Sequence, residues 1–282
     1  MVKYNKYSFM LSWNKYLSEI VGNEVTMNQK IFLCENSIEG IFTGVYNIWE
    51  SRYPKDSIKL SCEQEGNYEL FSEYINVNTD MIKADKVART IEQRFGELNY
   101  TNIYQAACSY EKDKANAIFR TIQYGLTSKT PRRLMEHLKD DNICRVFELS
   151  RAVGNESHHL LGFVRFKELT NKILCAVIEP KNDVVALIAP HFSDRLPNEN
   201  WMIYDKGRRL AVIHQGGGQW GIIKSNEFNI DFFETVSEKE KEFENLWRGF
   251  CDSISIKERE NLKLQRQNLP LRFQKDMVEF QR

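Results

Sequence analysis

The C-terminal half of the chain is organised around residues 162–205, which read GFVRFKEL (162–169), ILCAVIEPKNDVVALIAPHF (173–192) and DRLPNENWMIYD (194–205). Two apolar runs meet at Thr170–Asn171 and are typical of two strands joined by a tight turn. Residues from Asp183 to Arg195 are expected to form a helix, with Pro190 as a possible interruption. WMIYD is expected to form another strand. The stretch therefore predicts strands packed with a helix.

The strand pattern continues towards the C-terminus. RLAVIHQ (209–215) and WGIIKS (220–225) have the composition of strands, and the glycines at 216–218 between them are typical of a hairpin loop. Together the segments predict five antiparallel strands with one inserted helix. Ser237 and Glu240 form a capping-box pattern at the start of a further helix. The apolar side chains of that helix are expected to face inward: Phe243, Leu246, Trp247 and Phe250.

The N-terminal half has the pattern of a helical assembly on a small strand element. Lys30 to Cys34 predicts a short strand, and Ser37 is a candidate N-cap for a helix that reaches Trp49. Further helices are expected at 79–95, 99–109, 112–124, 130–138 and 142–153, and Gly154 is expected to end the last one. The predicted fold class is therefore α+β.

The changes of pattern divide the chain into three parts. Residues 1–28 are an aromatic-rich extension with a possible short amphipathic helix. Residues 29–156 are expected to form the mainly helical N-terminal region. Residues 157–282 are expected to form an α+β C-terminal domain with a basic tail.

The composition is that of a globular protein, with 42% hydrophobic and 28% charged residues. No apolar run approaches the roughly 20 residues that span a bilayer, and no signal pattern is present, so we expect a cytoplasmic protein. The cysteines form no CxxC pair, which predicts free thiols. Together with the absence of a phosphate loop, this spacing predicts that the chain binds no zinc, iron–sulfur cluster or nucleotide cofactor tightly. They are Cys34, Cys62, Cys108, Cys144, Cys175 and Cys251.

The formal net charge is zero, which argues against a general polyanion binder. The charge is nevertheless uneven. Residues 257–275 carry six Lys or Arg against two Glu, residues 112–151 carry nine against five acids, and residues 227–244 carry seven acids against two Lys. The two basic stretches can form an anion-binding face, or they can be solvated helix faces.

Four residues are candidates for catalysis: His158, His159, Arg165 and His191. An Arg among apolar neighbours usually pairs with a carboxylate or a phosphate, and a structural ion pair of Arg165 with Glu179 or Asp183 is one expectation. The histidines lack metal-ligand spacing. His191 is either a hydrogen-bonded structural residue or an acid–base or phosphate-contacting group.

The basic tail is the strongest candidate for nucleic-acid binding. If residues 257–267 are helical, Arg259, Lys263 and Arg266 share one face and can follow phosphates. Polar side chains between them can reach base edges. The alternative is that the tail is fastened to the body of the protein. The candidate residues are Arg259, Asn261, Lys263, Gln265, Arg266, Gln267 and Arg272.

Several phrases together carry a resemblance to a known family: GFVRFKEL, IEP (178–180), APHF (189–192), DRL (194–196), WMIYD (201–205), KEREN (257–261), LQRQ (264–267) and PLR (270–272). Over roughly residues 29–275 the chain resembles the bacterial "probable DNA metabolism protein" family, whose C-terminal half is a domain of unknown function. The resemblance implies a companion of a radical-SAM protein of DNA modification or repair. It also implies a link to uracil-DNA-glycosylase-like domains.

Two function classes follow. The first is a DNA repair or modification accessory protein, which binds nucleic acid, a radical-SAM or glycosylase-type partner, or both. The second is an enzyme that acts on a nucleotide or damaged base through an Arg and His pocket. The sequence contains no nucleophile elbow, metal motif or phosphate loop, which favours the first class.

Overall fold

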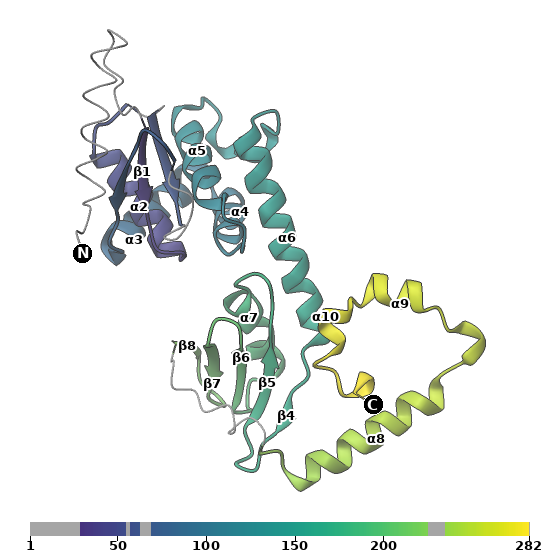
Figure 1. Ribbon diagram of the computed structural model, residues 1–282. Helices are drawn as coiled ribbons and strands as arrows, with labels where there is room; N and C mark the ends of the chain where they lie inside the picture. Colours follow the sequence, from purple (N-terminus) through teal and green to yellow (C-terminus); the bar gives the residue numbers. More distant parts are fainter. Residues whose placement is uncertain (1–28, 55–56, 63–68, 225–234, 282) are drawn as a thin grey trace, which may run out of the picture. The chain divides into compact units, whose positions relative to one another are not determined.

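The computed structural model describes residues 29–54, 57–62, 69–224 and 235–281. The chain divides into two compact units (Figure 1). The N-terminal unit runs to Ser150 without residues 108–110, and the C-terminal unit contains those three residues and everything from Arg151. Both mix helices with strands, so the α+β class is confirmed. The amphipathic helix expected within residues 1–28 lies outside the described residues.

The N-terminal unit contains a three-stranded sheet in the order β2-β1-β3, and both outer strands run parallel to the central one. Parallel neighbours need a crossover connection, and α2 supplies the one between β1 and β2. The strands are β1 (Gln29–Leu33), β2 (Ile58–Ser61) and β3 (Ser72–Asn76). The first of them confirms the strand predicted from Lys30.

Helix α2 (Ile38–Glu50) forms as predicted, because Ser37 caps it and its apolar face has a sheet to cover. The Ser37 hydroxyl accepts a hydrogen bond from the Gly40 N–H at 3.0 Å. The helix packs closely on β2, and a methyl group added at Gly44 would lie 2.5 Å from the Leu60 side chain. Its buried apolar residues include Ile41, Phe42, Val45 and Ile48.

The remaining helices before the unit boundary are α3 (Met81–Phe95), α4 (Glu97–Ala107), α5 (Lys114–Thr127) and the 3₁₀ helix η2 (Pro131–Glu136). The Asp80 carboxylate caps α3 by accepting from two backbone N–H groups. Four expected helices are thus confirmed with shifted ends, the last of them as a 3₁₀ helix.

Helix α6 (Asp141–Phe163) is longer than predicted, because it does not end at Gly154. Val153, Leu160 and Val164 are buried at helical spacing, so packing outweighs the roughly 1 kcal/mol that an interior glycine costs. The strand expected at 162–169 is therefore wrong in its first half, because α6 includes residues 162–163 and only Lys167–Glu168 form a strand. Arg165 lies in the loop that follows α6 and not in a strand.

The C-terminal unit contains a five-stranded sheet in the order β4-β5-β6-β7-β8. The expectation of a wholly antiparallel sheet is wrong at one pair, since β5 and β6 run parallel and α7 (Val185–Arg195) crosses between them. Helix α7 continues through Pro190 without a break. The strands are β4 (Lys167–Glu168), β5 (Leu174–Ile178), β6 (Trp201–Asp205), β7 (Leu210–His214) and β8 (Trp220–Lys224).

After the sheet, the chain forms α8 (Glu238–Ile254), η4 (Lys257–Arg259), α9 (Leu262–Asn268), α10 (Leu271–Gln274) and η5 (Val278–Phe280). Helix α8 begins at the predicted Ser237 cap. The prediction that its apolar side faces inward is wrong, because none of the residues of this helix, which is described in full, is buried. Leu246 is 68% exposed. Within the described ranges, no helix is both long and apolar enough to cross a membrane.

Candidate functional site

The end of the basic tail is fastened to the body of the C-terminal unit through Arg272 on α10. Its Nη1 atom lies 3.0 Å from Oε1 of Glu156, a carboxylate on α6 whose side chain is 2% exposed. Glu156 also accepts hydrogen bonds from the backbone N–H groups of Lys181 (3.1 Å) and Asn182 (2.8 Å), and from the Asn182 side chain (2.7 Å). Arg272 therefore fastens the tail to the body of the protein. For this residue, the structure supports attachment rather than an exposed contact for nucleic acid.

Arg165 forms a second link to the same segment. Its Nη2 atom lies 2.9 Å from Oε1 of Glu279 on η5. The expected pairing of Arg165 with Glu179 or Asp183 is therefore wrong, and Glu179 pairs with Lys275 instead. Burial opposes the ionisation of Glu279, but a backbone N–H and the Arg165 guanidinium outweigh it and hold the pKa of Glu279 below its usual value.

The three candidate histidines have separate surroundings. The His159 ring on α6 stacks on Phe163, with ring centroids 5.7 Å apart, and meets the edge of Phe273 at 5.9 Å. His158 is exposed on the same helix, and His191 is exposed on α7. Across the described ranges, no three His, Cys, Asp or Glu side chains gather closely enough to hold a metal ion. His159 thus helps to seat α10.

The middle of the tail differs from its end. Within the part of the chain that the structure describes, its cations face solvent without an acidic partner: Lys257, Arg259, Lys263 and Arg266. The predicted single helix is wrong, because the chain is extended at Glu260 and α9 starts afresh at Leu262. The Asn261 side chain caps α9 by accepting from the Leu264 N–H at 3.0 Å, so its carbonyl oxygen has a structural role. Gln265 and Gln267 are exposed.

In the other basic stretch, residues 112–151, many cations serve the fold. Lys114 is 4% exposed and donates to the Ala107 carbonyl at 2.7 Å. Arg145 contacts Asp113 at 2.7 Å, and Arg133 pairs with Glu136. This stretch therefore offers an anion fewer unpaired charges than the middle of the tail does.

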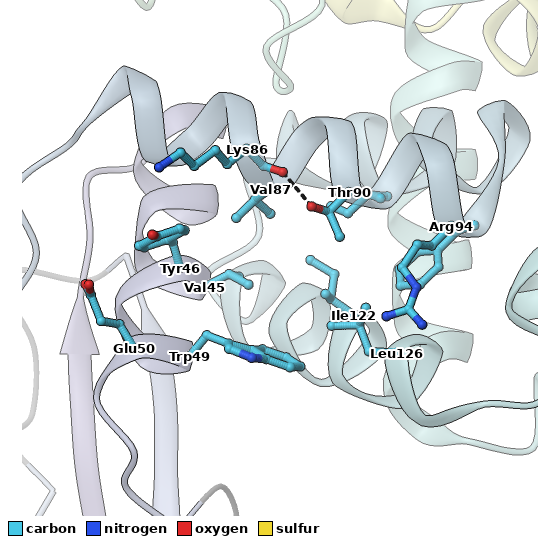
Figure 2. A pocket seen from close by; sticks show the side chains of 12 residues that line it. Val45, Tyr46, Trp49, Glu50, Lys86, Val87, Thr90, Arg94, Ile122 and Leu126 are labelled. Carbon is cyan, nitrogen blue, oxygen red and sulfur yellow. Dashed lines mark hydrogen bonds between the residues drawn. The ribbon is translucent and has the colours of Figure 1, made fainter.

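The N-terminal unit contains a pocket of about 430 Å3 between α2, α3 and α5 (Figure 2). Aromatic and cationic side chains border it: Tyr46 and Trp49 come from α2, and Lys86 and Arg94 come from α3 (Figure 2). Trp49 is 44% exposed. The apolar lining comprises Val45, Val87, Ile91, Phe95, Ile122 and Leu126. The Glu50 carboxylate also lines the pocket, so its border carries two cations and one anion. The arrangement suits a planar ring whose negative charge lies beside Arg94 or Lys86.

Sequence reasoning missed this pocket. The helical periodicity of α2 assigns Trp49 to the apolar face, and it gives no sign that the ring stays half open to solvent. Lys86 and Arg94 lie two turns apart on α3, among many charged residues of that helix. No short motif marks them, because the pocket depends on how three helices pack.

A family model described as a domain of unknown function, DUF4130, matches residues 112–279. The chain belongs to this family. The matched region covers more than half of the chain and runs from α5 to η5. No curated protein matches the chain.

One solved structure with some similarity to the chain is described as the DHH domain of a member of a family of ribosomal proteins. It is 10% identical in sequence, and the match covers 76% of this chain and 80% of that chain with a TM-score of 0.30. A similarity at this level carries no argument about fold or function.

Proposed function

We propose that the chain is an accessory protein of DNA repair or modification that binds nucleic acid through its tail. The observation that carries this proposal is the separation of the tail into two parts. Its end is clasped to the body by Arg272 and Lys275, whereas the four cations from Lys257 to Arg266 face solvent without acidic partners in the described chain. A fixed end and a row of unpaired cations suit contacts to phosphates.

The arrangement also limits what the tail reads. Lys and Arg contacts to phosphates position a protein on nucleic acid but carry no sequence information. Gln265 and Gln267 are exposed beside Arg266, and Gln side chains can bond to base edges. We therefore expect strong salt dependence from the four cations, and we expect any sequence preference to come from Gln265 and Gln267.

The test replaces Arg259 and Arg266 with Ala in the full chain. Binding of a fluorescent DNA duplex and of a single strand is measured by anisotropy at low salt. We expect the double variant to bind about tenfold more weakly. The matched control is Arg133→Ala, since Arg133 is an exposed arginine already paired with Glu136, and it should bind like the wild type. Absence of DNA binding by the wild type at low salt would refute the proposal.

The partner is proposed to be a radical-SAM DNA modification or repair protein, or a uracil-DNA-glycosylase-like domain, that docks on α8. A groove of about 730 Å3 runs along this helix, lined by Arg165, Phe166, Val278 and the apolar face of α8. Exposed apolar surface of this kind marks interaction sites. Two carboxylates that border the groove already have partners: Glu244 pairs with Lys167 at 2.8 Å, and Glu240 accepts from the Glu168 N–H. We therefore expect the partner to contribute mainly apolar side chains.

Copurification of the full chain with the purified radical-SAM protein tests the docking surface. Leu246→Asp should abolish the complex, because it places a charge in the apolar contact. Glu242→Gln, on the same helix but outside the groove lining, should leave the complex intact. A complex that survives Leu246→Asp contradicts the assignment of α8.

A second candidate function, nucleotide binding, is favoured by the pocket of the N-terminal unit and not by the Arg and His residues singled out in the sequence. Two cations of α3, Lys86 and Arg94, border the pocket, and the Glu50 carboxylate of α2 also lines it. Arg94 has no acidic partner within the described residues.

Titration of the full chain with a nucleoside monophosphate, followed by tryptophan fluorescence, tests this second candidate. We expect saturable binding that Arg94→Ala weakens and that His191→Ala leaves unchanged. Binding that is lost with His191→Ala and kept with Arg94→Ala would instead support an Arg and His pocket.

A further inference from the structure

Two cysteines that are 28 residues apart in sequence meet at the ends of neighbouring strands. Cys34 follows β1 and Cys62 follows β2, and their Sγ atoms lie 3.6 Å apart. The strands are parallel with Leu33 opposite Ser61, and the Cys34 N–H donates to the Ser61 carbonyl at 2.9 Å. The two cysteines therefore continue the strand register. The sequence predicts isolated thiols, because no spacing motif connects these two.

The surroundings make the two thiols unequal. Cys34 is 1% exposed, and Cys62 is half-buried. The hydrogen bond from the Cys34 thiol lowers the pKa of Cys62 against the opposing effect of burial, and the nearby Lys114 ammonium lowers it further. The same hydrogen bond and burial raise the pKa of Cys34. The more accessible sulfur therefore loses its proton more readily than its buried neighbour, and a thiolate is the reactive form of cysteine.

We propose that Cys34 and Cys62 form a redox site that a hydroperoxide oxidises reversibly to a disulfide. The Cys62 thiolate attacks one peroxide oxygen, the O–O bond breaks, and the products are a Cys62 sulfenic acid and an alkoxide that takes up a proton to become an alcohol. The Cys34 sulfur then attacks Cys62, and its proton leaves with the sulfenic hydroxyl as water. The thiols lose two electrons, and the peroxide gains them.

The geometry permits the second step with small movements. Neighbouring strands lie about 4.8 Å apart, which is within the Cα separation of about 4.4–6.8 Å that disulfides span. The two sulfurs must approach from 3.6 Å to about 2.05 Å. This approach closes a loop that contains α2 and β2 and would tie the ends of the two strands together.

Another buried cysteine of the chain shows the opposite chemistry. Burial raises the pKa of Cys175 in β5 to about 12, so this thiol stays protonated and unreactive. The difference between Cys62 and Cys175 comes from the neighbouring thiol and the ammonium, and not from burial alone. The inference does not depend on nucleic-acid binding, because the tail lies in the other unit.

The test treats the full reduced chain with equimolar hydrogen peroxide and maps the products by peptide mass spectrometry. We expect loss of two of the six thiols, a Cys34–Cys62 link, and recovery of both thiols with dithiothreitol. Before oxidation, iodoacetamide at pH 7 should modify Cys62 several-fold faster than Cys144, which is also half-buried.

Variants separate the two steps. Cys34→Ala should stop the reaction at a Cys62 sulfenic acid that dimedone traps, and Cys62→Ser should abolish the oxidation. The matched control Cys144→Ser should oxidise like the wild type. The proposal is wrong if Cys62 in the wild type reacts no faster than Cys144, or if the peroxide links any other pair of cysteines.

Discussion

Helices α2 and α8 have the same kind of N-terminal cap, but α2 is largely buried and α8 is exposed. Each is capped by a serine hydroxyl that accepts from the backbone N–H three residues later, at 3.0 Å for Ser37 and 3.1 Å for Ser237. Each has an apolar face at helical spacing. Yet α2 buries seven residues and α8 buries none.

The difference teaches what an amphipathic pattern determines. Periodicity and a cap determine that a helix forms and which side is apolar. They do not determine what covers that side. Helix α2 connects two strands of its own sheet, so the sheet lies against its apolar face. Among the described residues, α8 meets η5 at Val278, and the rest of its apolar face stays exposed. Within the described residues, both the apolar face of α8 and the four cations after it are exposed.

The largest difference between the two helices is expected in the free energy of unfolding after matched Phe→Ala substitutions. Phe42→Ala on α2 should lower the free energy of unfolding by about 4 kcal/mol, because it leaves a cavity in the core. Phe243→Ala on α8 should change it by no more than about 0.5 kcal/mol, since its side chain is already 53% exposed. Urea denaturation measures both. Equal losses would mean that α8 is covered within the chain.

The next largest effect is expected at the contacts of Glu156, which hold the end of the tail on the C-terminal unit. Glu156→Ala should destabilise the C-terminal unit by about 3 kcal/mol, because Arg272 and the Asn182 donors lose a buried carboxylate. Arg272→Ala should cost only about 1 kcal/mol, since Glu156 keeps its backbone partners. Urea denaturation of both variants checks the ratio. Equal costs would show that the ion pair, and not the backbone contacts, holds α10.

A smaller effect is expected from pH. The pKa of Glu279 is lowered in the folded chain, so its contribution to stability is present above the unfolded value of about 4.5. That contribution fades as the pH falls through the lowered folded pKa. Glu279→Gln should therefore be less stable than the wild type at pH 7, and the difference in melting temperature should shrink below pH 4.5. A difference that grows on acidification would contradict the pairing with Arg165.

Much of the fold could be predicted from local signals. Ser37 and Ser237 each mark a helix start, and four strands follow their apolar runs, at 174–178, 201–205, 210–214 and 220–224. The end of α6 could not be predicted, because Gly154 is a common stop signal and the burial of Leu160 is a tertiary effect. The parallel pairing of β5 and β6 depends on how α7 crosses between them.

Less of the candidate site could be predicted. The unpaired state of Arg259 and Arg266 agrees with their position in a basic stretch, but the break before α9 depends on the cap at Asn261. The partners of Arg165 and Arg272 lie more than a hundred residues away along the chain. Sequence spacing carries no record of such contacts.

The most direct test of the account is the salt dependence of DNA binding by the wild type and by the variant with Ala at both Arg259 and Arg266. The smallest stability effect is expected here, because exposed unpaired charges contribute about 0–1 kcal/mol. If both side chains contact phosphates, the slope of log affinity against log salt should fall by about 1.8 on duplex and about 1.4 on single strands. An unchanged slope, with the melting temperature lowered, would show that the tail is structural and does not bind nucleic acid.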